Sequence, residues 1–262
     1  MSSITRRPLR AVMTLCAVVA LAAPASALAD NYVALGDSYS SGVGTNSYTL
    51  SSSCLRGVYA YPYLVSQQRP NTSLNFVACS GATTTSLMAS QIQAVNSSTN
   101  VVTVTIGGND IGFASLLTQC TLGTCNTALA NTNAALPGSL NSKLDTVYTA
   151  IKNQAAPGAK VVVLGYPRVF SSSGCLGTTG ISSSERTAGN ALADKLDQTI
   201  AARAAAYGFT YKSAIASWTG HAVCSSSAWL NGLNIFKTTE SYHPNRNGNS
   251  AGYVPLVRSV IG

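Results

Sequence analysis

The sequence predicts an α/β fold in which helices flank a parallel β-sheet. Short apolar, β-branched runs recur along the chain with helical stretches between them: Tyr32–Leu35, Leu74–Ala78, Val101–Ile106, Lys160–Leu164 and Phe209–Lys212. The third and fourth runs have the composition of strands that are buried on both faces. Alternation of such strands with helices over this length is typical of a parallel sheet.

Five segments between and after these runs have helical patterns: Val58–Gln68, Thr85–Val95, Ser139–Gln154, Ser183–Tyr207 and Asn247–Val260. The fourth is the clearest, because it is rich in alanine and Gly208 follows it as a stop signal. We expect Ser183 or Ser184 to cap its N-terminus. Pro157-Gly158 ends the preceding helix.

Residues 1–29 have the pattern of a secretory signal peptide. Arg6, Arg7 and Arg10 form a basic start, an apolar run follows from Val12 to Ala23, and small residues precede Asp30. The run is too short for a typical transmembrane helix. We therefore expect a mature chain of residues 30–262 that forms one domain, is exported, and has no integral membrane segment.

Charge and composition exclude some classes of function. Removal of three signal-peptide arginines from sixteen basic residues leaves thirteen, against eight acidic residues, so the mature net charge is +5. These charges are scattered rather than gathered in the basic stripe of a nucleic-acid-binding protein. A mildly basic surface favours transient contact with anionic lipid interfaces.

Six cysteines follow the signal peptide, which itself holds Cys16. An even number in an exported chain favours disulfides, and six cysteines allow 15 connectivities. We expect the sequential pairs Cys54–Cys79, Cys120–Cys125 and Cys175–Cys224. A zinc site is the alternative, but no Cys-x-x-Cys pair occurs, so no metal site is expected.

Polar and small residues follow three of the predicted strands. Ser38 follows the first in Gly36-Asp37-Ser38-Tyr39-Ser40, Gly81 follows the second, and Asn109 the third. Reactive groups in parallel sheets gather beyond the carboxyl ends of the strands. Because position 40 is not Gly, the Gly-x-Ser-x-Gly elbow of the α/β-hydrolases is absent. Gly81 allows its backbone N–H to approach a ligand closely.

Asn109 and Asp110 follow two glycines, and two interpretations remain open for them. The Asn109 amide can donate to an oxyanion, or either residue can cap a helix that begins at Ile111. The two interpretations are compatible if Asp110 is the cap and Asn109 faces the site. A phosphate-binding loop is excluded because no Gly-Lys-Ser/Thr follows.

The chain has two histidines, and they differ in context. His221 has the surroundings of a structural or solvated residue. His243 lies three residues after Glu240, and Pro244 follows it, which favours an extended conformation. A serine at the first strand end and a late histidine suggest a nucleophile and its base.

Together these four blocks resemble the GDSL, or SGNH, hydrolase family. Gly36-Asp37-Ser38 resembles the first block, Gly81 the second, Gly107-Gly108-Asn109-Asp110 the third, and the segment around His243 the fourth. The six cysteines and Glu240–Asn245 further resemble the secreted lipases and phospholipases A of actinobacteria. The resemblance implies a flavodoxin-like, three-layer α/β/α sandwich with a central five-stranded parallel sheet.

The same resemblance implies a mechanism without metal or cofactor. Ser38 attacks an ester carbonyl, His243 acts as general base and then acid, and the oxyanion is held by the N–H groups of Ser38 and Gly81 with the Asn109 side chain. The family usually has Asp three residues before the histidine, whereas this chain has Glu240. Either Glu240 or the backbone carbonyl of Ser241 orients the imidazole, and we expect the backbone to do so.

We therefore expect a secreted, monomeric ester hydrolase that acts on acyl lipids as a lipase, an esterase or a phospholipase A. A deacetylase of polysaccharides or small esters is the nearest alternative. A lipid- or glycan-binding protein without catalytic activity, built on the same fold, is the alternative from another class. The sequence leaves acyl length and positional preference open.

Overall fold

Five parallel strands form the sheet at the centre of the chain. The computed structural model describes residues 1–3 and 30–262, apart from the side chains at positions 114, 118, 122 and 137; the expected signal peptide, with Cys16, lies outside them except for its first three residues. The strands are ordered β2-β1-β3-β4-β5. Their bounds are β1 Asp30–Gly36, β2 Thr72–Phe76, β3 Val101–Thr105, β4 Lys160–Leu164 and β5 Thr210–Lys212. The five predicted strands are confirmed, with small shifts at their ends.

Burial explains why the central strands are so apolar. Every residue of β3 is buried, and so is every residue of β4 except Lys160. β2 lies at one edge of the sheet, and its side chains alternate between half-buried and exposed. The central strands are covered on both faces, as their runs of β-branched residues predict.

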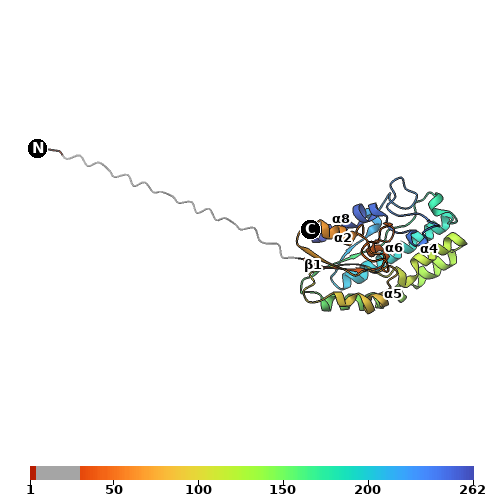
Figure 1. Cartoon of the computed structure of the whole chain (residues 1–262), viewed down its shortest axis with the longest axis horizontal. Helices are drawn as coiled ribbons and strands as arrows, with labels where there is room; N and C mark the ends of the chain where they lie inside the picture. Colours follow the sequence, from red (N-terminus) through yellow and green to blue (C-terminus); the bar gives the residue numbers. More distant parts are fainter. Residues whose placement is uncertain (4–29) are drawn as a thin grey trace.

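Helices cover both faces of the sheet and produce three layers (Figure 1). α2 (Tyr61–Gln67) packs against α8 (Val254–Ile261) on one face. On the other face lie α3 (Thr84–Ser90), α5 (Asn126–Gln154) and α6 (Ser183–Ala206), of which the last two pack along each other. The α/β/α architecture is thus confirmed.

Shorter elements connect these layers. They are α1 Ser38–Ser41, η1 Ile92–Ala94, η2 Asn109–Ile111, α4 Phe113–Leu122, η3 Leu176–Thr178, α7 Ala214–Ser217, η4 Thr238–Glu240 and the π-helical turn η5 Gly248–Tyr253. Several lie beyond the carboxyl ends of the strands, where they carry the polar residues singled out in the sequence.

The boundaries of four helices differ from the prediction. α2 begins at Tyr61 rather than Val58, and the expected helix Asn247–Val260 is divided into η5 and α8, which ends at Ile261. α5 begins at Asn126 rather than Ser139, although Pro137-Gly138 lies within it. Leucines on both sides of this dipeptide, among them Leu136 and Leu140, are buried in the core, so tertiary packing stabilises the helix across the proline. The expected helix Thr85–Val95 is divided into α3 and η1 at Gln91.

The start of α6 is also corrected. Its N-cap is Ser182, not Ser183 or Ser184, because the Ser182 hydroxyl accepts from the Glu185 N–H in a capping box. One oxygen of the Glu185 carboxylate accepts from the Ser182 N–H at 2.9 Å, and the other accepts from the Cys125 N–H at 2.6 Å. The cap therefore joins α6 to the disulfide-bonded turn before α5.

Three disulfides join loops of the described chain. They are Cys54–Cys79, Cys120–Cys125 and Cys175–Cys224, the sequential pairs expected from the sequence. The first links the segment after α1 to the end of the β2 region. The third closes the longest loop, with a sequence separation of 49 residues.

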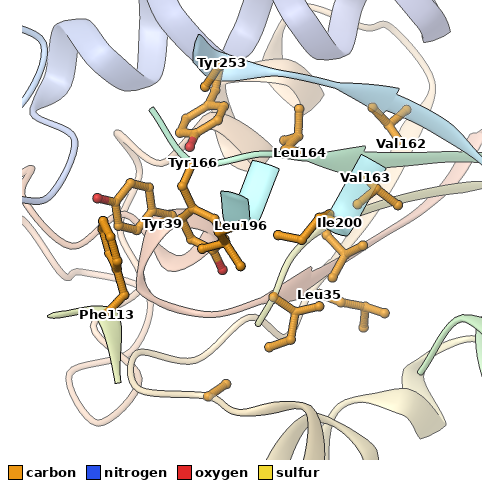
Figure 2. Close-up of a cluster of buried hydrophobic side chains, with 14 of the residues drawn as sticks. Leu35, Tyr39, Phe113, Val162, Val163, Leu164, Tyr166, Leu196, Ile200 and Tyr253 are labelled. Atoms are coloured by element: carbon orange, nitrogen blue, oxygen red, sulfur yellow. The ribbon is translucent and has the colours of Figure 1, made fainter. Parts of the chain in front are cut away.

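The hydrophobic core extends from the sheet to the edge where the strands end. Figure 2 shows part of this core: Leu35 of β1, Val162, Val163 and Leu164 of β4, and the α6 side chains Leu196 and Ile200. Farther along, the rings of Tyr39 and Tyr166 meet edge to face with centroids 5.0 Å apart. This aromatic layer separates the aliphatic core from the polar groups above it.

Candidate active site

Ser38 lies at the carboxyl end of β1, in a turn that requires glycine. Gly36 has φ +132°, and a Cβ there would lie 2.6 Å from the Thr105 carbonyl oxygen. Asp37 then caps α1, because its carboxylate accepts from the Tyr39 N–H at 3.0 Å. The tight turn and the cap hold Ser38 at the first position of a short helix.

Position 40 shows why the common hydrolase elbow is absent. The Ser40 hydroxyl is buried and lies 2.7 Å from Thr105 Oγ1 and 2.9 Å from Tyr61 Oη. These hydrogen bonds tie α1 to β3 and α2. Ser40 is therefore part of the support under Ser38, a role that glycine has no side chain to fill.

His243 meets Ser38 across a sequence separation of 205 residues. Its Nε2 lies 2.8 Å from Ser38 Oγ, and its Nδ1 lies 2.9 Å from the Ser241 carbonyl oxygen. A carbonyl oxygen only accepts, so Nδ1 carries the proton and Nε2 is free to accept from the serine hydroxyl. Burial lowers the pKa of His243 from 6.5 to about 4, although the Ser241 hydrogen bond opposes this. The imidazole is neutral at pH 7.

The Glu240 carboxylate makes no hydrogen bond with the His243 imidazole among the described residues. It is buried, and its Oε1 accepts a hydrogen bond from the Tyr48 hydroxyl. Glu240 makes no ion pair with His243 within the part of the chain described here. Of the two candidates for orienting the imidazole, the Ser241 carbonyl occupies the position and the Glu240 side chain points elsewhere.

A left-handed turn aims the Ser241 carbonyl at the imidazole. Tyr242 has φ +61°, which is unusual for a tyrosine. Its N–H donates to the Asn231 carbonyl at 3.1 Å, and its carbonyl accepts from the Tyr39 hydroxyl at 2.8 Å. Tyr39 and Asn231 thus hold this turn. No local sequence signal identifies them, because the two contacts are made across 203 and 11 residues.

Three residues with hydrogen-bond donors, Ser38, Gly81 and Asn109, line the pocket that contains the Ser38 hydroxyl. The Asn109 amide donates to the Ala82 carbonyl at 3.0 Å, which leaves its second N–H available. Among the described residues, neither the Ser38 N–H nor the Gly81 N–H has an acceptor. Gly81 has φ +78° with open space where a side chain would be.

The predicted nucleophile, base and oxyanion donors line one pocket, whereas Glu240 lines a neighbouring one. The first pocket has a volume of about 430 Å³, and it is lined by Ser38, Gly81, Asn109, Ser241 and His243, together with Ser80, Ser115, Thr238 and Thr239. The pocket lies where β1 and β3 end and the strand order reverses, the usual ligand position in open α/β sheets.

Asp110 caps a helix, but not the one expected. Its carboxylate accepts from the Thr84 N–H at 2.9 Å and from the Thr84 hydroxyl at 2.6 Å, at the first turn of α3 rather than at Ile111. The loop after β3 is thereby fastened to the start of the helix after β2. This places Asn109 beside Gly81.

Asp37 is a buried carboxyl beneath the site, and no local sequence pattern predicts the contacts that it makes there. It accepts hydrogen bonds from the Thr105 hydroxyl at 2.8 Å and from the Tyr166 hydroxyl, whose oxygen accepts from the Gly108 N–H at 3.2 Å. Burial raises its pKa from 3.8 to about 6, and these hydrogen bonds limit the rise. Tyr166 follows β4, so only the fold brings it to Asp37.

The described residues include no metal-ligand cluster and no membrane-spanning helix. Within residues 1–3 and 30–262, no three His, Cys, Asp or Glu side chains group so that they could hold a metal ion. No helix of the same ranges is long and apolar enough to cross a bilayer. The pocket of Ser38 offers a hydroxyl, a neutral imidazole and N–H donors to a ligand.

Comparisons with known proteins agree with this geometry. A model of the GDSL-like lipase/acylhydrolase family matches residues 34–251. Lipase 1 of Streptomyces coelicolor is 45% identical over 256 residues, which cover 95% of this chain and 93% of that protein. A lipase of Streptomyces rimosus is 44% identical over 236 residues, which cover 88% and 87% of the two chains.

Solved structures give the same result. The extracellular lipase of Streptomyces rimosus superposes with a TM-score of 0.84 at 44% identity, over 88% of this chain and 100% of that one. Phospholipase A1 of Streptomyces albidoflavus NA297 also has a TM-score of 0.84, at 43% identity over 88% and 99%. An acetylxylan esterase of Geobacillus stearothermophilus shares the fold at 13% identity, with a TM-score of 0.55 over 89% and 94%.

Proposed function

This chain belongs to the GDSL-like lipase/acylhydrolase family, and we propose that it hydrolyses carboxylic esters of acyl lipids with Ser38 as nucleophile and His243 as general base. The observation that carries the proposal is the 2.8 Å contact between Ser38 Oγ and His243 Nε2. Because Nδ1 is held by a carbonyl oxygen, Nε2 is the accepting nitrogen, as a general base requires.

The reaction proceeds in two steps. In the first, His243 Nε2 takes the Ser38 proton as Oγ attacks the ester carbonyl, and it then gives this proton to the leaving alcohol. In the second, water attacks the acyl-enzyme and the histidine repeats both transfers. The N–H groups of Ser38 and Gly81, with the Asn109 amide, hold the oxyanion in both steps. Each such donor contributes on the order of 3 kcal/mol to the transition state.

The substrate class follows from the relatives with high identity. Those above 40% identity that are described here carry the names lipase or phospholipase A1, which favours acyl lipids over acetylated polysaccharides. The acetylxylan esterase shares only the fold, at 13% identity. A binding protein without catalytic activity is disfavoured, because the serine, the histidine and the oxyanion donors all face one pocket.

The setting of the enzyme is part of the proposal. Residues 1–29 act as a signal peptide and residues 30–262 form a single, secreted, monomeric domain. Three disulfides and an extracellular relative support export. The enzyme works without a cofactor, does not bind nucleic acid, and makes transient contact with lipid interfaces.

A fluorophosphonate probe tests the nucleophile. It should label the wild-type chain on Ser38 at neutral pH and leave Ser38→Ala unlabelled. Ser98→Ala, at an exposed serine before β3, is the control variant that should be labelled like wild type. Absence of labelling in folded wild-type protein would refute the mechanism. Rates on fatty acyl esters, phospholipids and acetylated xylan then separate lipase, phospholipase and deacetylase, and a preference for xylan would refute the assigned substrate class.

A further inference from the structure

Three large apolar side chains protrude from two loops of the described chain. Leu176 is 88% exposed, Ile235 is 70% exposed and Phe236 is 90% exposed. Among the side chains described in residues 30–262, the only other exposed large apolar one is Leu50, at 43%. Exposed apolar residues that gather in one place mark interaction sites. Leu176, Ile235 and Phe236 are called the apolar patch below.

The two loops that carry the apolar patch are fastened to each other. The Leu233 N–H donates to the Gly177 carbonyl at 2.8 Å. Gly177 and Gly232 approach so closely that a Cβ on Gly232 would lie 2.6 Å from the Gly177 Cα. The Cys175–Cys224 disulfide holds the first loop from the other side. The patch is therefore built on a fixed base.

Asn234 arranges the tip of the second loop. Its side-chain oxygen accepts from the N–H groups of Phe236 and Lys237, each at 3.0 Å. Its own N–H donates to the Ser241 hydroxyl at 2.8 Å. These bonds satisfy the backbone at the tip while the Ile235 and Phe236 side chains face solvent. They also connect the tip to Ser241, whose carbonyl holds the His243 imidazole.

The apolar patch adjoins the mouth of the active site. Its three residues line a pocket of about 870 Å³, which Lys237 and Glu240 also line. The same segment continues into Thr238 and Thr239, which line the pocket of Ser38 and His243. A surface that met the patch would therefore lie beside the site.

The exposed charges of the molecule favour a negatively charged surface. None of the eight Asp and Glu side chains is exposed: each is buried or half-buried, and four of them form ion pairs. Lys237, next to Phe236, is exposed, as are Lys143, Lys152, Lys160, Arg168, Arg246 and Arg258. Anionic lipid headgroups attract basic groups at the membrane surface.

From these observations we propose that Leu176, Ile235 and Phe236 insert into anionic lipid surfaces and that Lys237 binds the headgroups beside them. This inference rests on the proposed function, because it assumes that the substrate is an acyl lipid. The patch buries its side chains in the acyl layer and brings the active-site mouth to the plane of the ester bonds. A second copy of the chain is the competing occupant.

Vesicle binding by the full mature chain carrying Ser38→Ala, which prevents hydrolysis, tests the patch. Ile235→Ser and Phe236→Ser should each weaken partitioning into phosphatidylglycerol/phosphatidylcholine vesicles about tenfold. Each variant lacks an apolar side chain that the bound protein would bury in the acyl layer. Phe236→Leu should remain within about threefold of the parent. Lys237→Gln should weaken binding about fivefold on these vesicles and not on neutral ones, whereas Lys160→Gln, at the opposite end of the sheet, should have no effect.

Three results decide between the inference, the proposed function on which it rests, and a second copy as the occupant of the patch. Thermal unfolding of each variant verifies its fold before binding is compared. If wild type hydrolyses soluble p-nitrophenyl acetate while the Ser38→Ala chain does not bind vesicles, insertion of the apolar patch into lipid is refuted and the proposed function stands. If the Ser38→Ala chain binds but wild type hydrolyses no ester, the proposed function is refuted instead. A dimer that Phe236→Ser dissociates would assign the patch to a second copy.

Discussion

Lowering the pH should leave the His243 imidazole neutral until about pH 4. Its pKa falls from 6.5 to about 4 because the ring is buried, and the neutral Ser241 carbonyl offsets little of that cost. The difference corresponds to roughly 3 kcal/mol in favour of the neutral ring. A carboxylate on Nδ1 would act in the opposite direction and raise the pKa.

The sign of the effect on stability follows from proton binding. Between pH 6.5 and about pH 4, unfolded His243 binds a proton that the folded ring does not, so stability falls as the pH falls through this window. Asp37 has the opposite effect, because its folded pKa of about 6 exceeds 3.8 and folding gains stability as the pH falls between these values. The two contributions are similar in size, so unfolding curves alone do not separate them.

Measurements of activity and of NMR titration distinguish the pKa of His243 from that of Asp37. On a soluble ester, kcat/KM should fall about tenfold per pH unit only below about pH 4. Imidazole resonances, assigned with His221→Asn, should give the same value for His243. Asp37→Asn removes the titration of the Asp37 carboxyl. It should leave the fall of kcat/KM below about pH 4 unchanged. An NMR pKa of 6.5 or higher for His243 would refute the assignment of a neutral, backbone-oriented base.

Three further predictions concern single contacts. Asn109→Ala should lower kcat by roughly 10²–10³ with little change in KM, because it removes an oxyanion donor; steady-state kinetics measure this. Glu240→Gln should keep kcat/KM within about threefold of wild type, since the amide oxygen can still accept from Tyr48. Replacing Cys175 and Cys224 by Ala should lower the free energy of unfolding by about 2–5 kcal/mol, as measured by denaturant unfolding.

Each of these predictions has an outcome that contradicts it. A loss with Glu240→Gln as large as that of His243→Ala would mean that the carboxylate supports the base. If Asn109→Ala raises KM and leaves kcat unchanged, the amide binds substrate rather than the transition state. Unchanged unfolding of the variant without the Cys175–Cys224 bridge would show that the loops are held by their other contacts.

Much of the fold could be predicted because the signals are local. The β-branched runs of β3 and β4 identify buried strands, and the residues after each strand gather at one edge of a parallel sheet. That rule predicts that Ser38, Gly81 and Asn109 lie together, and the structure places them around one pocket.

Features that depend on distant partners could not be predicted in the same way. Spacing alone left Glu240 and Ser241 as alternatives, and the partner that turns Glu240 away is Tyr48, 192 residues earlier in the chain. Likewise, the proline at position 137 is a local signal to end a helix, yet buried leucines on both sides continue α5 through it. The apolar patch is visible only once the exposure of its side chains is known.

The two loops that supply oxyanion donors are cross-linked before any substrate arrives. Asn109 is bonded to the Ala82 carbonyl, and Asp110 holds the N-terminus of α3 through Thr84, so Gly81 and Asn109 belong to one rigid frame. Dipoles in such a frame need not reorient as negative charge grows on the carbonyl oxygen. In water, solvent dipoles would have to reorient around the growing charge, whereas these donors are already in position when the chain has folded. A structure of the inhibited enzyme should therefore show Gly81 and Asn109 in the same positions as in the free enzyme.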